Sequence, residues 1–309
     1  MKRLSRRPSY PRIFSRRYSN RLDLIKNKKF QVLDKGFVRL VDCMPTYFDD
    51  KLGLDKAIVD AARISYSYPE DQQTTKNTDK NLIDFLMRHK HTSPFEMIDF
   101  KFHIKVPIFV FRQWIRHRTA SVNEISARYA ELGGEFYTPH ELLSQAINNR
   151  QCSGNELTDV KLKQEFFALC KNPQSYKDYK QMLDNNGVSR EIARIILPLN
   201  TYTEAYWKID LHNLFHFLRL RMSNDAQKEI VEYADTIYTK IVKPLCPISS
   251  RSFEKHVLNS VTFSELDIDI IKEGGFGNIP SFKDAKKIAK EISKGEYREL
   301  IEKINNILK

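Results

Sequence analysis

The densest cluster of chemically useful side chains in this sequence lies between residues 112 and 128. Gln113, Arg116 and His117 stand three and four residues apart, so on a helix they would share one face. Arg118 adds a second arginine, and guanidinium groups match phosphate oxygens bidentately. This spacing favours an anion-binding site. A solvated basic face is the alternative, but it would normally lack the flanking aliphatic residues and Trp114 found here.

A second group of polar residues follows directly. Glu124, Ser126 and Arg128 are spaced by two, so an extended segment would present all three on one side. A hydroxyl such as that of Ser126 can complete the shell around an anion whose charge is met by arginine. We expect Ser126 to bind a ligand rather than attack it, because Glu124 among arginines would be a weak base and Arg128 cannot accept a proton.

The element that must position these side chains is a strand before them. Residues 97–106 alternate with period two, which predicts a strand with Phe100, Phe102, Ile104 and Val106 on its buried face. Pro107 suits the first turn of a helix running to about residue 118. The polar cluster is therefore expected where a buried strand passes into a helix.

The rest of the chain alternates between short strands and helices. Residues 30–41 predict a strand pair that turns near Lys35-Gly36, and an apolar stripe including Ile58, Ala62 and Ile64 predicts a helix over 54–66. Beyond residue 155 the pattern is mostly helical, and a glycine-rich joint at 274–277 precedes two amphipathic helices. The expected helices are 54–66, 78–89 after a polar loop at 67–77, 157–185, 188–196, 203–222, 224–243, 281–293 and 295–308.

Charge is distributed unevenly along the chain. The net charge is +12, and residues 1–30 carry eleven Lys/Arg and one acid, which leaves +2 for the other 279 residues. A DNA-binding domain would have a basic body, so specific nucleic-acid binding is not expected. The Arg- and Ser-rich start has the composition of an organelle transit peptide, but also of a solvated arm or of an arm that binds a partner. It lacks the apolar stretch of a secretory signal.

The length of the apolar runs and the spacing of the cysteines further limit the class of protein. The longest clean apolar run is 106–111, far below the roughly 20 residues of a membrane-spanning helix, so no membrane association is expected. Cys43, Cys152, Cys170 and Cys246 show no CxxC spacing, which argues against a metal site and a disulfide framework. This cysteine usage fits a reducing compartment. We expect a cytoplasmic protein, or a mitochondrial one if the basic extension is a transit peptide.

The motif Arg116-His117-Arg118, seven residues and then Ser126 resembles the signature of the flavin-dependent thymidylate synthases. Four other segments resemble that family in the same order, at 62–66, 91–96, 190–200 and 218–221, and the resemblance spans roughly residues 30–250. It implies an α+β fold with a central, largely antiparallel sheet flanked by helices. We expect a basic disordered extension over 1–29, the synthase domain over 30–255 and a C-terminal helical extension over 256–309.

The same resemblance implies reductive methylation of dUMP to dTMP. The one-carbon donor would be 5,10-methylenetetrahydrofolate, the cofactor FAD and its reductant NADPH, in a homotetramer with shared active sites. Arg221 would be catalytic, because a fixed cation stabilises negative charge at N3 of the pyrimidine. The implied cofactor-binding residues are Ser93, Arg116, His117, Arg118, Glu124, Asp210, His212 and His216. The implied substrate-binding residues are Gln113, Trp114, Arg116, Glu124, Ser126, Arg128, Arg194 and Arg221.

This chain departs from the family pattern at several positions. Asp210, His212 and His216 stand where family members often carry Asn-x-Arg followed by Asn, although acid and imidazole can still hydrogen-bond a ribose or an adenine edge. Asp225 and Met97 both stand where a histidine is common. Two rival functions remain: a flavin- and folate-using methyltransferase of RNA, which would need a basic body, and a non-enzymatic nucleic-acid or scaffold protein acting through the basic tail.

Overall fold

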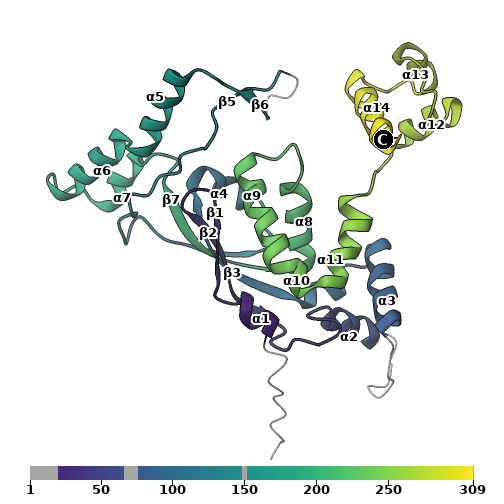
Figure 1. The fold of residues 1–309 in the computed structure, drawn as a ribbon, viewed down its shortest axis with the longest axis horizontal. Helices are drawn as coiled ribbons and strands as arrows, with labels where there is room; N and C mark the ends of the chain where they lie inside the picture. Colours follow the sequence, from purple (N-terminus) through teal and green to yellow (C-terminus); the bar gives the residue numbers. More distant parts are fainter. Residues whose placement is uncertain (1–19, 66–75, 148–151, 309) are drawn as a thin grey trace, which may run out of the picture. The chain divides into compact units, whose positions relative to one another are not determined.

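The computed structural model describes residues 20–65, 76–147 and 152–308 (Figure 1). The chain divides into two compact units, Met1–Glu254 and Lys255–Lys309. Unit 1 holds a sheet of five strands in the order β1-β2-β3-β7-β4, and every neighbouring pair is antiparallel. The strands are β1 (Lys29–Val32), β2 (Gly36–Met44), β3 (Asp99–Pro107), β7 (Tyr202–Asp210) and β4 (Ser121–Glu124). The predicted α+β fold with a central antiparallel sheet is confirmed.

One face of the sheet carries the core of unit 1. The four inward side chains predicted for β3 are all fully buried, which confirms its period-two pattern. Their partners across β7 are apolar or small, as in the pair Phe102–Trp207. The helices α4 (Ile108–Trp114), α8 (Leu211–Arg221) and α9 (Lys228–Ile237) pack with this sheet, and Figure 1 shows α8 and α9 in front of it. Trp114 and Phe217 bring two of these helices onto Trp207, with ring centroids about 5 Å apart.

The turn between β1 and β2 lies where the sequence placed it. A Cβ on Gly36 would lie 2.8 Å from the carbonyl oxygens of both Lys105 and Val32, so only glycine fits this close approach of strands. The hydroxyl of Tyr233 on α9 also reaches this point and donates to the Lys105 carbonyl at 2.6 Å. A tight turn thus ties the helix layer to the sheet.

The remaining helices of unit 1 surround this core. A buried carboxylate connects two of them: Asp55, just before α2, accepts hydrogen bonds from Ile248 N at 2.6 Å and from the N and Oγ of Ser249. Burial raises the pKa of Asp55 to about 7. The elements are α1 (Asn20–Ile25), α2 (Lys56–Ile64), α3 (Lys76–Arg88), η1 (Ser93–Met97), α5 (Val160–Lys171), α6 (Gln174–Asp184), α7 (Arg190–Ala193), η2 (Arg194–Ile196), η3 (Tyr238–Val242), α10 (Lys243–Leu245) and α11 (Pro247–Phe253), with a hairpin of β5 (Leu143–Gln145) and β6 (Ser153–Glu156).

Several expected helices differ from the structure. The helix expected over 203–222 is wrong in its first half, because 202–210 form strand β7 and the helix begins at Leu211. The helix expected over 157–185 is interrupted at Pro173, which cannot continue the hydrogen-bond ladder. The helix after Pro107 ends at Trp114, so Arg116 and His117 follow it. On α2, Val59 is buried whereas Ile64 is 81% exposed, so the predicted stripe was misplaced at its end.

The basic extension also ends earlier than expected. Residues 20–25 form α1, and Leu22 and Ile25 on this helix are buried. Lys26 pairs with Asp42 at 2.8 Å, and Lys29 opens strand β1. The expectation of disorder up to residue 29 is therefore wrong for residues 20–29, while residues 1–19 and the loop expected at 67–77, up to residue 75, lie outside the described part.

Unit 2 is a small helical unit with its own core. Its helices are α12 (Glu265–Gly274), α13 (Phe282–Ile288) and α14 (Lys294–Leu308). Ile270, Leu300 and Ile304 are among the buried residues of this core. Ser264 and Asp267 form a capping box at the start of α12, a helix that the sequence pattern did not predict.

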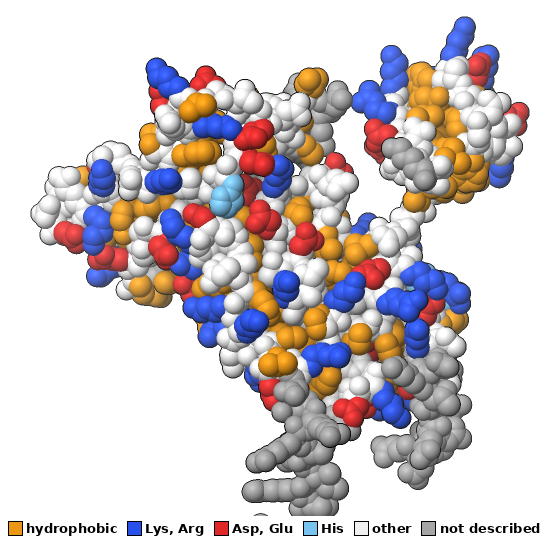
Figure 2. Space-filling model, viewed as in Figure 1, with side chains coloured by type: hydrophobic (Ala, Val, Ile, Leu, Met, Phe, Trp, Pro, Cys, Tyr) orange, Lys and Arg blue, Asp and Glu red, His pale blue; other side chains and the backbone are white. Residues whose placement is uncertain are grey.

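The described residues carry both signs of charge on their surface. On the face shown in Figure 2, Lys/Arg and Asp/Glu side chains are interspersed rather than gathered by sign. In the described part of the chain no helix is long and apolar enough to cross a membrane. Among the same residues, no group of three or more His, Cys, Asp or Glu side chains is arranged to hold a metal ion. The four cysteines are free.

Candidate functional site

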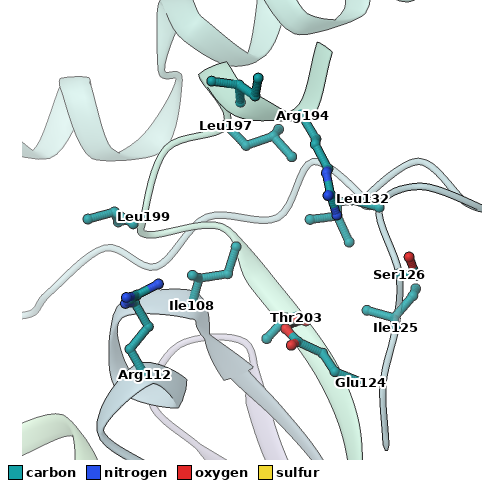
Figure 3. A pocket seen from close by; sticks show the side chains of 12 residues that line it. Ile108, Arg112, Glu124, Ile125, Ser126, Leu132, Arg194, Leu197, Leu199 and Thr203 are labelled. Carbon is teal, nitrogen blue, oxygen red and sulfur yellow. Dashed lines mark hydrogen bonds between the residues drawn. The ribbon is translucent and has the colours of Figure 1, made fainter. Parts of the chain in front are cut away.

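The polar motif lines two pockets in unit 1. The first, called the Ser126 pocket, has a volume of about 550 Å³, within the range of small-molecule sites. Figure 3 shows Arg112 from α4 and Arg194 from η2 on opposite sides of it. Its lining residues are Ile108, Arg112, Glu124, Ile125, Ser126, Ala127, Leu132, Arg194, Ile195, Leu197, Leu199 and Thr203. Two cations, a hydroxyl and a carboxylate among aliphatic side chains suit a ligand with one anionic end and one flat or apolar end.

The carboxylate of the Ser126 pocket is held from the neighbouring strand. Thr203, at the start of β7 and almost fully buried, donates its hydroxyl to Glu124 Oε1 at 2.7 Å. Glu124 is the last residue of the edge strand β4, which pairs with β7. The position of this carboxylate is therefore fixed by strand pairing and by one buried hydroxyl.

Ser126 and Arg128 lie in a turn, not in an extended segment. Strand β4 ends at Glu124, and the Ser126 carbonyl accepts from the N–H groups of Tyr129 and Ala130. Ser126 Oγ accepts from Arg128 N at 3.3 Å. The expectation that an extended segment presents Glu124, Ser126 and Arg128 on one side is wrong, because the last described backbone hydrogen bond from this segment to β7 is that from Ile125 N to the Glu204 carbonyl and a turn follows it.

The second pocket, called the Arg221 pocket, has a volume of about 310 Å³. It lies between the end of α4, which leads into the Arg-His-Arg run, and α8. Its lining residues are Arg116, His117, Arg118, Thr119, Ile209, Asn213, His216, Leu220 and Arg221. In the described part of the chain the guanidinium groups of Arg116 and Arg118 have no hydrogen-bond or ion-pair partner, so both are free to meet an anionic ligand.

One polar contact links the two sides of the Arg221 pocket. Arg221 donates from Nε to His117 Nε2 at 2.9 Å and from Nη2 to the Gln113 carbonyl at 3.5 Å. Burial, followed by the neighbouring charges of Arg221 and His216, lowers the pKa of His117 to about 4. Burial also lowers the pKa of Arg221 and that of His216. His117 is therefore neutral at physiological pH.

The predicted site residues are divided between these pockets. The Arg221 pocket contains Arg116, His117, Arg118, His216 and Arg221, and the Ser126 pocket contains Glu124, Ser126 and Arg194. The structure does not bring Ser93, Gln113, Arg128, Asp210 or His212 to the wall of either pocket. One chain thus places its predicted substrate residues in two separate places.

Several of the residues outside the pockets have partners of their own. Gln113 hydrogen-bonds Gln227, and Arg128 pairs with Glu191 at 3.1 Å. Asp210 caps α8 by accepting from Asn213 N and Nδ2. These contacts hold the elements that carry the pockets.

Trp114 requires a correction. The family resemblance implies substrate binding for it, but its side chain is 0% exposed and packs among Trp207, Phe217 and Tyr233. It lies on the inner side of α4, whereas Gln113 is partly exposed. Trp114 is therefore a core residue that fixes the helix from which the motif extends.

Residues that sequence reasoning missed also line the pockets. Arg112 lines the Ser126 pocket and has no side-chain partner among the described residues. Its signal was present, since it lies four residues before Arg116 in the same motif. Thr203 and Asn213 gave no such signal, because the first was expected in a helix and the second lies between His212 and His216 but outside the positions that the resemblance assigns to the cofactor.

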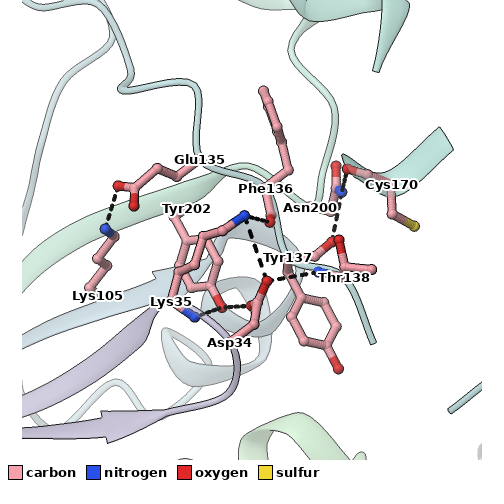
Figure 4. Close-up of polar contacts among 10 residues, drawn as sticks. All are labelled: Asp34, Lys35, Lys105, Glu135, Phe136, Tyr137, Thr138, Cys170, Asn200 and Tyr202. Carbon is pink, nitrogen blue, oxygen red and sulfur yellow. Dashed lines mark hydrogen bonds and ion pairs between the residues drawn. The ribbon is translucent and has the colours of Figure 1, made fainter. Parts of the chain in front are cut away.

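A polar network fastens the chain that follows the motif to the sheet (Figure 4). Asp34, in the β1–β2 turn, accepts from the Tyr202 hydroxyl at 2.7 Å and from Thr138 N at 3.3 Å. Lys35 Nζ donates to the Phe136 carbonyl at 2.8 Å. Residues 136–138, at the far end of the segment that begins at the Ser126 turn, are thus tied to the β1–β2 turn.

Known proteins share both the sequence and the fold. The family model described as Thymidylate synthase complementing protein matches residues 48–248. A flavin-dependent thymidylate synthase of Treponema denticola is 47% identical over 272 residues, covering 87% of this chain and 96% of the relative. That of Thermus thermophilus is 51% identical over 243 residues, covering 78% and 84%.

A solved structure of a related enzyme is also similar to this chain in fold and sequence. A UMP/dUMP methylase from Streptomyces cacaoi, bound with 5-Br dUMP, has a TM-score of 0.64 and 31% identity, and the match covers 75% of this chain and 100% of that one. The fold, the two arginine-bearing pockets and these likenesses define an α+β methyltransferase. More particularly, the chain belongs to the family of flavin-dependent thymidylate synthases.

Proposed function

We propose that this chain methylates dUMP to dTMP reductively, with 5,10-methylenetetrahydrofolate as one-carbon donor and with FAD that NADPH reduces. Flavin dependence and dTMP synthesis accompany membership of the family. The observation that carries the finer assignment is the pair of arginine-bearing pockets beside one motif. Each pocket includes residues that the resemblance assigns to nucleotide or flavin.

The expected substrate-binding residues would position the charged and polar groups of dUMP. In the Ser126 pocket, Arg194 and Ser126 would bind the phosphate of dUMP, since a guanidinium and a hydroxyl are suitable donors to phosphate oxygens. Glu124, held by Thr203, would accept from the sugar or base. Arg221 would face the pyrimidine and stabilise negative charge at N3.

The residues of the Arg221 pocket fit FAD. Two guanidinium groups without partners in the described part of the chain, Arg116 and Arg118, suit its pyrophosphate. Asn213 and His216 offer hydrogen-bonding groups for a ribose or an adenine edge. We assign Ser93, Asp210 and His212 to FAD on the family resemblance alone. When bound, reduced flavin supplies the hydride, and the protein's part is to orient and polarise.

We further propose a homotetramer whose active sites combine residues of several copies. The support is the division of the predicted substrate residues between two pockets of one chain. If a neighbouring copy brings its Ser126 pocket against an Arg221 pocket, the separated residues join in one site. We place the protein in the cytoplasm because of its free cysteines, or in mitochondria if the basic extension is a transit peptide.

The test is a reconstitution with purified protein. With FAD, NADPH and 5,10-methylenetetrahydrofolate present, dUMP should be converted to dTMP, and omission of any one of them should stop turnover. UMP serves as the competing substrate and a structured RNA as the rival methyl acceptor. A folded, flavin-loaded protein that forms no dTMP from dUMP would refute the proposal.

A further inference from the structure

The contact between His117 and Arg221 joins residues that lie 104 positions apart in the chain. Arg221 extends from the last turn of α8, and His117 follows α4 by three residues. Arg221 uses Nε for His117 and directs Nη2 towards the Gln113 carbonyl, at the longer distance of 3.5 Å. A guanidinium has five N–H donors, so three remain for a ligand.

The imidazole of His117 can make this contact in one form only. Arginine has no acceptor, so Nε2 of His117 must carry the lone pair and Nδ1 the proton. The low pKa of His117 keeps the ring neutral and this lone pair available. Phe217 packs against the ring edge at 4.9 Å and 72°, and the His216 ring lies 5.9 Å away at 63°. Packing therefore fixes the direction of the lone pair.

We propose that His117 is a positioning residue for Arg221: its Nε2 accepts from Arg221 Nε and so orients the guanidinium that polarises the pyrimidine. This inference rests on the proposed function of Arg221. It adds a second task to a residue otherwise assigned to flavin. The requirement is a hydrogen-bond acceptor at the place of Nε2, and Phe217 supplies the packing that keeps it there.

Two substitutions of His117 distinguish the effect of the hydrogen-bond acceptor from that of the imidazole ring. A glutamine side chain places its amide near the position of Nε2, whereas an asparagine side chain reaches only the position of Nδ1. We expect His117→Asn to weaken dUMP binding and to lower kcat by about tenfold or more, the scale of a lost hydrogen bond to a charged group. His117→Gln should stay within about threefold of wild type. His140→Asn, at an exposed histidine outside both pockets, is the matched control.

A double-mutant cycle then tests whether His117 acts through Arg221. The dissociation constant of dUMP is measured by calorimetry at saturating FAD for wild type, His117→Asn, Arg221→Ala and the double variant, so that the readout does not require turnover. If the effect of His117→Asn vanishes in the Arg221→Ala background, the inference holds. An effect that persists there, or equal behaviour of His117→Asn and His117→Gln, overturns it. A wild-type protein that binds no dUMP would instead refute the proposed function.

Discussion

The guanidinium of Arg128 lies 3.1 Å from the carboxylate of Glu191, and this ion pair joins the Ser126 turn to α7. Arg194, in the next turn of the chain, donates from Nε to the backbone carbonyl of the same Glu191. Glu191 therefore contacts two arginines that the resemblance assigns to dUMP. A substrate phosphate that takes Arg128 must displace this carboxylate.

We expect Glu191→Gln to lower the KM for dUMP. Both side chains of the pair are about half exposed, and exposed ion pairs contribute about 0.2–1 kcal/mol, so the KM should fall by at most about fivefold. Steady-state kinetics at low and moderate salt measure the change, which should shrink as salt screens the pair. Glu131→Gln, which removes one of the two acidic partners of Lys180, is the control. An increased KM would mean that Glu191 orders the site rather than competing for it.

The buried hydroxyl of Thr203 leads to a second prediction. Thr203→Val keeps the volume but removes the donor that holds Glu124, so the carboxylate loses its fixed position. Hydrogen bonds to charged groups contribute about 1.5–3 kcal/mol, so kcat/KM for dUMP should fall by about tenfold or more. Thr203→Ser restores the hydroxyl and should recover most of the loss. If Thr203→Ser and Thr203→Val are equally impaired, the methyl group and its packing are what matter.

Asp55 predicts a pH dependence of stability. Burial raises its folded-state pKa to about 7 from an ordinary value of 3.8, so the folded chain keeps a proton that the unfolded chain has released. Its contribution is fully present below about pH 4 and is lost as the pH rises through about 7. A shift from 3.8 to about 7 corresponds to on the order of 4 kcal/mol.

The side chain of Asp55→Asn cannot titrate, so this substitution should remove the contribution of Asp55 to the pH dependence of the free energy of unfolding. Urea unfolding between pH 4 and 8, at fixed protein concentration, gives the free energy of unfolding of both proteins. The wild type should lose stability relative to Asp55→Asn as the pH rises. Asp184→Asn, at an exposed carboxylate, should run parallel to the wild type. A constant difference between wild type and Asp55→Asn would show that Asp55 is ionised across this range.

The described start of the chain predicts different results for two truncations. Residues 1–19 lie before α1 and before the segments that resemble the family, so turnover should stay near wild type when they are removed. Removal of residues 1–29 also deletes α1, whose Leu22 and Ile25 are buried, and cuts Lys29 from β1. The loss of two buried aliphatic side chains costs about 1.5–3 kcal/mol each by area, so this protein should unfold at clearly lower urea. Equal midpoints for the two truncations would place α1 outside the cooperative core.

The sequence could predict those parts of the fold whose secondary structure is determined by one local pattern of residues. Strand β3 alternates strictly, and its four inward residues are buried as expected. Residues 203–210 were expected to be helical, but together with Tyr202 they form strand β7. The strand forms since β3 and β4 pair with it on either side, a long-range condition that no local window contains.

The candidate site was predicted in its residues more than in its geometry. The motif spacing identified Arg116, His117 and Ser126, and all three line pockets. Spacing could not show that α4 ends at Trp114 and that Trp114 is buried in the core. It also could not show that His117, beyond the helix, contacts Arg221. The division of the site residues between two pockets depends on tertiary packing, so it could not be predicted from their spacing in the sequence.

The last prediction concerns Ser126, whose hydroxyl accepts from Arg128 N. A serine nucleophile needs a base within hydrogen-bond reach that a third group orients. Glu124 is engaged by Thr203, and Arg128 cannot accept a proton. Among the described residues the Ser126 hydroxyl therefore has no base beside it, but it lines a pocket that also contains Arg112 and Arg194, as a phosphate donor would.

Ser126→Ala should accordingly raise the KM for dUMP by about tenfold while leaving kcat measurable at saturating dUMP, since one hydrogen bond to a charged ligand is lost. Ser126→Thr, which keeps a hydroxyl, should fall between the two proteins in KM. Mass spectrometry of the acid-quenched enzyme provides the second readout, because a nucleophilic Ser126 would carry the nucleotide covalently. A trapped adduct on Ser126, or no turnover at saturating dUMP in a folded and flavin-loaded Ser126→Ala protein, would show that this hydroxyl takes part in bond formation.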